Sequence, residues 1–222
     1  MFYVAGKPQF ADEKPLKIPW NSEFLHKIQA SGDYTAELKL DDHRGFLSIG
    51  KDGKIDFWSR RGSKVSLDKE ILDNLKQMSL PKGLVLDGGL FKRKEFGSRL
   101  WLFDILIIKG NKILDVFEKR RKLLENIVIP TNYIWVPEQT NTFIPEFSDI
   151  LKKKSSLIQN SSIKYGFDCK LLEKFIEGLV IKKLDGKLSY PWVTKETSNF
   201  FKLRKADCTT SSKQMILKSV SY

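Results

Sequence analysis

The sequence predicts an α+β fold in which mostly antiparallel sheets are flanked by helices. Along the 222 residues, strand-like and helix-like runs do not alternate regularly, as they would in a doubly wound parallel sheet. Turn-rich segments also separate neighbouring strand-like runs, which is typical of antiparallel hairpins. The hydrophobic content of 41% is enough to bury a core. We therefore expect one large domain at residues 21–205, between an irregular N-terminal segment at 1–20 and a tail or linker at 206–222.

The first elements of this domain are predicted to be a short helix and three strands. Apolar residues at helical spacing, from Phe24 to Ile28, predict a helix that ends near Gly32. Strand-like runs follow at 34–40, 44–50 and 54–59. A turn-rich tetrapeptide that begins and ends with glycine joins the last two runs, so we expect the three strands to form an antiparallel meander.

The middle of the chain predicts a second helix and a second meander. Ser66 can cap an amphipathic helix that Pro81 would stop. Strands are expected near 83–91 and 99–108. The second of these runs is apolar at nearly every position, which predicts a central strand that is buried on both faces.

The last third of the chain predicts helices and strands in mixed order. An amphipathic helix with a basic outer face is expected at 116–127, and the serine-rich segment 155–162 is expected to be a mobile surface loop. The remaining expected elements are strands at 133–138, 177–184 and 199–205 and helices at 145–154 and 168–176.

The charge of the chain predicts a polyanionic partner. The formal net charge is +12, and the basic residues recur in clusters at 92–94, 119–122 and 152–154. Nucleic acid is the first candidate for such a partner. An acidic membrane surface is the competing candidate, but the chain has no basic amphipathic helix with a broad apolar face and no apolar run of membrane-spanning length. We therefore expect no membrane partner.

The cysteines predict neither a disulfide framework nor a zinc site. Cys169 and Cys208 lie far apart and show no Cys-x-x-Cys or Cys/His ligand spacing. The N-terminus has no basic region before a sustained apolar stretch, so no secretory signal is expected. We expect a cytoplasmic location, which would be the host cytoplasm for a viral protein.

Several short segments carry charged side chains at the ends of the predicted strands. In chain order these segments are Lys39-Leu-Asp41-Asp42-His-Arg44, Ser59-Arg60-Arg61-Gly62, Leu86-Asp87-Gly88-Gly89-Leu90, Phe103-Asp104, Glu177-Gly178-Leu-Val-Ile-Lys182-Lys183 and Phe201-Lys202-Leu-Arg204. Their order, spacing and strand context resemble the nucleotidyltransferase (adenylation) domain shared by ATP-dependent DNA ligases, RNA ligases and mRNA capping enzymes. The resemblance covers residues 34–205 and is strongest to the DNA ligase branch.

The resemblance implies a covalent nucleotidyltransferase (ATP-grasp-like) domain and a defined reaction. The amine of Lys39 would attack the α-phosphate of ATP and expel pyrophosphate, and the resulting lysyl-AMP would pass its AMP to a 5′-phosphate end. ATP and Mg²⁺ are the implied cofactors, and nicked or broken double-stranded DNA is the implied substrate in DNA repair or replication. An RNA ligase acting on RNA ends, a capping guanylyltransferase and a catalytically weak nucleic-acid-binding module remain the alternatives.

The implied site combines catalytic, nucleotide-binding and metal-binding residues. Lys39, Lys202 and Arg204 would be catalytic, because cations near Lys39 favour the neutral amine that attacks. Strand alternation places Glu37 on the face of Lys39 and Lys202 on the face of Arg204. The implied ATP-binding residues are Glu37 at the adenine, Arg44 at the ribose, Phe103 stacked on the base, and Arg60, Lys182 and Lys202 at the phosphates, beside Lys39 itself.

Metal ligands and nucleic-acid contacts complete the implied site. Glu177 and Asp87 are the expected Mg²⁺ ligands. The residues expected to contact nucleic acid are Asp41, Arg60, Lys92, Arg93 and Lys94. Each assignment has a plain structural alternative: Lys39 as a solvated strand lysine, Phe103 as a core residue, and Lys202 with Arg204 as a basic surface stripe.

The chain departs from the family pattern at two positions. Asp42 stands where the family has glycine in the first motif, and Gly89 stands where the family has glutamate in the second motif. A carboxylate that would help with the ribose or the metal is thus missing from position 89. Ligases of this family also usually continue into an OB-fold domain, and few residues follow Lys205. We therefore expect no OB domain in this chain and a separate OB-fold domain or subunit as a partner.

Overall fold

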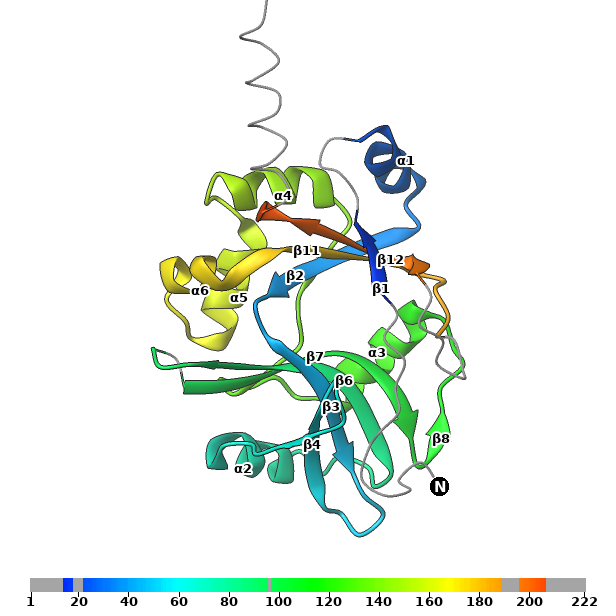
Figure 1. Ribbon diagram of the computed structural model, residues 1–222, viewed down its shortest axis with the longest axis vertical. Coiled ribbons are helices and arrows are strands. Elements are labelled where there is room, and N and C mark those ends of the chain that lie inside the picture. The colour runs from blue at the N-terminus through cyan, green and yellow to red at the C-terminus, as the bar shows by residue number, and fades with distance from the viewer. Residues whose placement is uncertain (1–13, 18–21, 96, 189–195, 207–222) are drawn as a thin grey trace, which may run out of the picture. The chain divides into compact units, whose positions relative to one another are not determined.

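The computed structural model describes residues 14–17, 22–95, 97–188 and 196–206 (Figure 1). These residues form six helices and two sheets, which confirms the predicted α+β fold. The described chain divides into two compact units. The five-strand unit holds residues 14–17, 22–41, 138–184 and 196–206, and the seven-strand unit holds residues 42–95, 97–137 and 185–188. Among the described residues, no helix has the length and apolar character needed to cross a bilayer.

The five-strand unit contains one sheet and four helices. Its strand order is β1 (Lys14–Lys17), β12 (Glu196–Arg204), β11 (Ile176–Lys183), β2 (Tyr34–Leu40) and β10 (Gln139–Thr140). The β1–β12 pair is parallel, and the other neighbours are antiparallel. The helices are α1 (Glu23–Ser31), α4 (Phe143–Leu151), α5 (Ser156–Tyr165) and α6 (Cys169–Phe175).

Alternation along the central strands of this sheet separates an apolar face from a polar face. Leu38, Leu179 and Leu203 lie opposite one another on three adjacent strands and are buried. Helix α4 contacts β11, and α1 contacts both β2 and α4, so these helices supply further apolar side chains to the core. The intervening residues of β2, β11 and β12 are mostly polar and lie on the other face.

The seven-strand unit contains the second sheet and two helices. Its strands are β5 (Lys64–Val65), β4 (Ile55–Ser59), β3 (His43–Ile49), β6 (Leu84–Arg93), β7 (Gly97–Ile108) and β8 (Asn111–Lys112) in that order, and β9 (Ile134–Trp135) pairs parallel with β7. The helices α2 (Lys69–Gln77) and α3 (Phe117–Ile127) contribute Ile71, Leu75 and Leu124 to its core. Strand β7 is interior to the sheet and largely buried, as predicted.

The first predicted meander is wrong in one respect. Strands β3 and β4 form the expected hairpin, but β2 belongs to the other sheet. The described non-glycine residues with positive φ are Ser79, Lys109 and Lys153, so neither Asp41 nor Asp42 adopts the conformation that a tight hairpin turn requires. Strands β2 and β3 therefore do not pair as a hairpin.

The serine-rich segment 155–162 is a helix, and the prediction of a mobile loop is wrong. Ser155 is the N-cap of α5, where its side chain accepts a hydrogen bond from the backbone N–H of Ile158 at 3.1 Å. Leu157 and Ile158 are buried. A serine cap followed by two apolar residues provides a helix start and an apolar anchor in spite of the polar composition.

The expectations for the start of α2, the outer face of α3 and the irregular N-terminal segment also require correction. Asp68, and not Ser66, is the N-cap residue of α2. The outer face of α3 is only partly basic, because Arg120 and Arg121 are buried while their lysine neighbours are exposed. Within residues 1–20, the segment Lys14–Lys17 forms strand β1. Of the predicted tail at 206–222, residues 207–222 lie outside the described residues.

Candidate active site

Strands β11 and β2 pair with one extra residue on β11. Gly178 lies opposite Lys39, whereas Ile176 lies opposite Leu40, so the pairing skips Glu177. A β-bulge of this kind re-aims a side chain that regular alternation would place on the opposite face. Glu177 consequently points to the face of Lys39, and its Oε2 atom accepts a hydrogen bond from the Nζ atom of Lys39. The bulge therefore brings together two residues that the sequence pattern alone left unconnected.

Glycine at position 178 is required for this geometry. Its φ is +149°, which side chains rarely allow. A Cβ atom built on Gly178 would lie 2.9 Å from the carbonyl carbon of Leu203 and 3.1 Å from the Cα atom of Arg204. The close approach of β12 thus leaves no room for a side chain there.

The register of the sheet aligns three basic side chains on one face. Gly178 lies opposite Lys39 on β2 and opposite Arg204 on β12, and Val180 lies opposite Lys202. Residues directly opposite one another in antiparallel strands project to the same face. Lys39, Lys202 and Arg204 therefore share the polar face of the sheet, as the two-residue spacing of Lys202 and Arg204 predicts.

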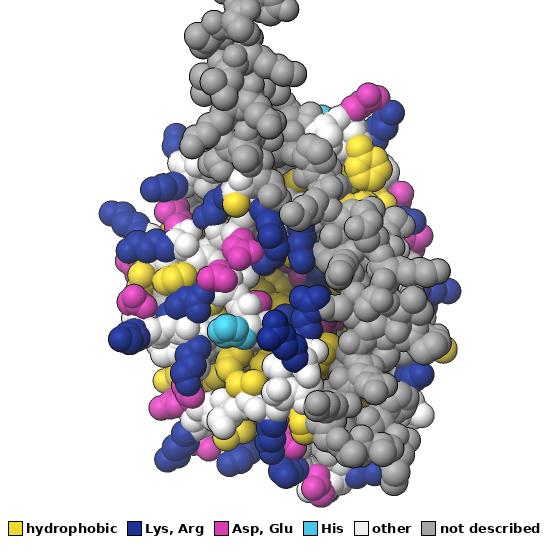
Figure 2. All heavy atoms as spheres, in the orientation of Figure 1, with side chains coloured by type: hydrophobic (Ala, Val, Ile, Leu, Met, Phe, Trp, Pro, Cys, Tyr) yellow, Lys and Arg dark blue, Asp and Glu magenta, His cyan; other side chains and the backbone are white. Residues whose placement is uncertain are grey.

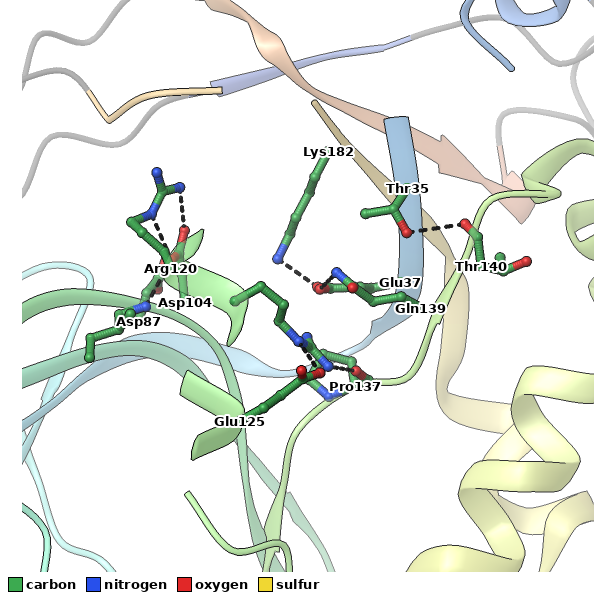
Figure 3. A network of polar contacts seen from close by, with 12 residues as sticks. Thr35, Glu37, Asp87, Asp104, Arg120, Glu125, Pro137, Gln139, Thr140 and Lys182 are labelled. Carbon is green, nitrogen blue, oxygen red and sulfur yellow. Dashed lines mark hydrogen bonds and ion pairs between the residues drawn. The ribbon is translucent and has the colours of Figure 1, made fainter. Parts of the chain in front are cut away.

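Glu37 lies in a buried polar cluster on the same face (Figure 3). Its Oε2 atom lies 2.5 Å from Nζ of Lys182, and its Oε1 atom accepts a hydrogen bond from the Gln139 amide at 2.9 Å. Only 2% of Glu37 and 6% of Lys182 are exposed. Sequence reasoning expected Lys182 to be out of phase with Glu177, but the bulge places both on the face of Lys39. It missed Gln139, which lies on a two-residue strand with no periodic signal.

In the seven-strand unit, Arg44 is bound to Asp87 by a bidentate ion pair. The Nε and Nη2 atoms of Arg44 donate to the two carboxylate oxygens of Asp87 at 3.2 and 2.6 Å. The negative charge of Asp87 is the largest cause that raises the pKa of Arg44, and Asp42 and Asp104 act in the same direction. Arg44, expected at the ribose, is therefore held in a strongly acidic environment.

Phe103 and Asp104 lie at an irregularity of strand β7. Asp87 lies opposite Asp104 and Gly88 lies opposite Leu102, so the pairing skips Phe103. The side chain of Phe103 is half-buried, not fully enclosed in the core. Asp104 is bound by both ends of the guanidinium group of the fully buried Arg120, at 2.9 Å each (Figure 3). No sequence pattern predicted that Arg120 is the partner of Asp104.

The two departures from the family motifs lie next to each other in the seven-strand unit. Arg44 on β3 lies opposite Gly89 on β6, and Asp42 is two residues before Arg44. A Cβ atom built on Gly89 would lie 2.8 Å from the Oδ1 atom of Asp42 and closer still to its carboxyl carbon and Oδ2 atom. The carboxylate of Asp42 thus occupies the volume that a side chain at position 89 would need.

The residues expected to contact nucleic acid are accessible. Asp41 and Arg60 are exposed, and the Arg60 backbone N–H donates to the carbonyl of Arg44 at 3.2 Å. Lys92 and Lys94 are exposed, and Lys92 also donates to Asp68 at 3.2 Å. Figure 2 shows Lys and Arg side chains spread over the viewed face with Asp and Glu side chains among them. The basic surface is therefore mixed with acidic groups.

The expected metal ligands are both engaged by cations. Asp87 is bound by Arg44, and Glu177 contacts Lys39. Among the described residues, no group of three or more His, Cys, Asp or Glu side chains is arranged to hold a metal ion. Mg²⁺ bound with a nucleotide usually takes only one or two carboxylates together with phosphate oxygens and waters. The single carboxylate of Glu177 fits that chemistry. Asp87 would have to give up its bidentate contact with Arg44 to bind the metal.

Comparison with known proteins identifies the fold. No family model matches the chain. DNA ligase 1 of Saccharomyces cerevisiae is 24% identical over 230 residues, which cover 90% of this chain and 28% of the yeast protein. The structure of a mycobacterial DNA ligase D complexed with ATP and MES matches with a TM-score of 0.52 and 19% identity, over 88% of this chain and 59% of that chain. An archaeal ATP-dependent RNA ligase matches with a TM-score of 0.51 and 14% identity, over 91% of this chain and 50% of that chain. The chain thus shares their fold and spans less than two thirds of each of these relatives.

Proposed function

Since the chain has the fold of the adenylation domain found in the ATP-dependent DNA and RNA ligase superfamily, we propose that it is a nucleotidyltransferase that carries AMP on Lys39 and delivers it to a 5′-phosphate end of DNA. The observation that carries this proposal is the polar face of the five-strand sheet. There the amine of Lys39 contacts Glu177 and shares the face with Lys202 and Arg204. A lysine amine among phosphate-binding cations is the arrangement that attack on a nucleotide requires.

In the proposed reaction, the Nζ atom of Lys39 loses a proton to solvent water and attacks the α-phosphorus of ATP. A nitrogen–phosphorus bond forms, and the bond from phosphorus to the pyrophosphate oxygen breaks. Lys202 and Arg204 bind the oxygens of the α-phosphate, where negative charge develops, and Glu177 positions the Lys39 side chain. Glu177 would also hold Mg²⁺, which neutralises phosphate charge when it is bound.

The remaining nucleotide contacts are assigned to Glu37, Arg44 and Phe103. Glu37 would read the adenine, with its carboxylate fixed by Lys182 and Gln139. Arg44, fixed by Asp87, would bind the ribose, and Phe103 would stack on the base. Two of these side chains are already held by hydrogen bonds, so binding would cost little of their conformational entropy.

DNA is the proposed substrate, and RNA is the second candidate. The similarity to a yeast DNA ligase and to a mycobacterial DNA ligase D favours DNA and a role in repair or replication. The archaeal RNA ligase has an equally similar fold, which keeps RNA ends as the alternative. An OB-fold domain is the proposed partner that would complete the sealing reaction.

The covalent intermediate provides the first test. The protein is incubated with ATP or GTP and Mg²⁺, and its intact mass is measured after denaturation. We expect a gain of one AMP from ATP, no gain from GTP, and no gain in Lys39→Ala. A gain of one GMP would instead indicate a capping guanylyltransferase. The absence of any adduct in the unaltered chain would contradict the proposal and favour a nucleic-acid-binding module.

Substrate choice requires a second measurement. A pre-adenylated nick in DNA and the matched nick in RNA are supplied without ATP, and joining is followed in a single turnover. Faster joining of the DNA nick would support a DNA ligase. Faster joining of the RNA nick would reassign the substrate to RNA while the adenylation chemistry stayed the same.

A further inference from the structure

Asp42 and Gly89, the two positions that depart from the family motifs, are in direct competition for space. The carboxylate of Asp42 lies where the side chain of any other residue at position 89 would begin. Gly89 does not have a positive φ, so the backbone at this position would accept an ordinary residue. The three atoms nearest to a Cβ atom at position 89 all belong to the carboxylate of Asp42, so this carboxylate is the first obstacle to a side chain there.

The carboxylate of Asp42 also lies in the electrostatic environment of Arg44. Arg44 is opposite Gly89 across β3 and β6, and it follows Asp42 by two residues. Asp87 binds the guanidinium group directly, and the charge of Asp42 acts on the same group. Asp42 is half-buried, so this interaction is screened by water less than a pair on the open surface would be.

We propose that Asp42 is a positioning residue that supplies the acidic group at this point of the sheet and orients Arg44 for the nucleotide, while Gly89 is glycine so that this carboxylate fits. The two departures are then one exchange: the carboxylate comes from the β2–β3 connection in place of strand β6. The inference rests on the proposed function, since Arg44 acts on the ribose there. It assigns Asp42 a role through Arg44 and not in the bond-making step.

Two variants and their combination distinguish the effect of the charge of Asp42 from the effect of its position. Asp42→Asn keeps the shape and removes the charge, and Gly89→Ala adds a methyl group that displaces the carboxylate. We expect each to slow adenylation about tenfold at low ATP, mainly through a higher KM for ATP. Because both act through one carboxylate, the double variant should be no slower than either single variant. Asp73→Asn, which removes a carboxylate from the exposed surface of α2, should match the unaltered chain.

Two outcomes of this cycle would overturn the inference. An Asp42→Asn variant with an unchanged KM would show that only shape matters at this position. Losses that multiply to about a hundredfold in the double variant would show that Gly89 acts independently of Asp42.

A third variant moves the carboxylate back: Asp42→Gly with Gly89→Glu should adenylate within about threefold of the unaltered chain, whereas Asp42→Gly alone stays slow. A double variant as slow as Asp42→Gly would contradict the exchange.

Thermal unfolding keeps this inference distinct from the proposed function. If the unaltered chain forms no adenylate, the proposed function fails, but the contact between the two positions can still be measured. Gly89→Ala should then lower the unfolding midpoint in the chain that carries Asp42 and leave it unchanged in the Asp42→Gly background. Equal shifts in both backgrounds would overturn the inference, whatever the activity.

Discussion

The Nζ atom of Lys39 is hydrogen-bonded to the Oε2 atom of Glu177, 138 positions further along the chain. Regular strand alternation would send these side chains to opposite faces, because Gly178, and not Glu177, lies opposite Lys39. The extra residue in β11 interrupts the alternation of side chains, so Glu177 projects to the same face as Lys39. The central contact of the proposed site therefore depends on a local irregularity of the backbone.

Replacing Lys39 by alanine should abolish covalent AMP formation while the fold is retained. The lysine lies on the polar face of β2 and not in the core, so the free energy of unfolding should change by no more than about 1 kcal/mol. Intact mass after incubation with ATP measures the adduct, and circular dichroism measures the fold. Lys51→Ala, in an exposed turn, is the matched control. An adduct that persists in Lys39→Ala would place the nucleophile elsewhere.

Removing either Lys202 or Arg204 should slow adenylation more than tenfold. Each is proposed to make a charge-assisted contact to the α-phosphate, which is worth roughly 1.5–3 kcal/mol. Rapid-quench measurement of the adenylation rate tests this, with Lys174→Ala on the exposed side of α6 as the control for lost positive charge. Unchanged rates in both variants would reduce the last strand to a basic surface stripe.

Alanine at position 178 should damage both stability and adenylation. The added Cβ atom would collide with the backbone of Leu203 and Arg204 and would also hold an unfavourable φ, so we expect a cost above about 2 kcal/mol. Gly32→Ala is the control, because Gly32 also has a positive φ but no atom within 4 Å of the added Cβ. Urea unfolding compares the two. Equal costs would mean that backbone strain alone accounts for the glycine at 178.

Loss of Arg120 should be among the most destabilising single changes in the seven-strand unit. Arg120→Ala would leave the buried carboxylate of Asp104 without its bidentate partner, at a cost of about 3–5 kcal/mol. Lys119→Ala, one residue earlier on α3 and exposed, should cost less than about 0.5 kcal/mol. Chemical denaturation measures both values. A small cost for Arg120→Ala would contradict the view that this ion pair is essential to the unit.

The cluster at 92–94 should contribute to binding of polynucleotide through phosphates. Replacing Lys92, Arg93 and Lys94 by alanine should weaken binding of a nicked duplex and make the slope of log K against log salt shallower by roughly two to three, at about 0.9 per lost phosphate contact. Fluorescence anisotropy across a salt series gives this slope. Removing three lysines elsewhere, at 51, 54 and 82, is the control for net charge. The same change of slope in the control would mean that the cluster at 92–94 contacts phosphates no more than other surface lysines do.

The sequence was informative where a local pattern determined the structure. Alternation placed Glu37 and Lys39 on one face and Lys202 and Arg204 on one face, and the register of the sheet agrees. The apolar run at 99–108 identified the interior strand β7. These features depend on residues two positions apart, so a single segment is enough to reveal them.

What the sequence did not reveal depends on contacts between distant segments. Strand pairing is non-local, so the assignment of β2 and β3 to different sheets has no signal within residues 34–49. The burial of Arg120 depends on Asp104 from β7, and the fixed carboxylate of Glu37 depends on Gln139 and Lys182. The contact between Asp42 and Gly89 likewise appears only once β3 and β6 are paired.

The two sheets draw their strands from different stretches of the chain, so the seven-strand sheet is fully synthesised before the five-strand sheet. Among the described residues, the strands of the seven-strand sheet lie between residues 43 and 135, whereas the sheet that carries Lys39 takes its last strand from residues 196–204. Domains generally fold as their segments emerge during synthesis. We therefore expect the first sheet to form on the nascent chain while β2 still awaits β11 and β12. Lys39, the proposed nucleophile, would then be synthesised before the strands that complete its sheet and would reach its final surroundings only once β11 and β12 have formed.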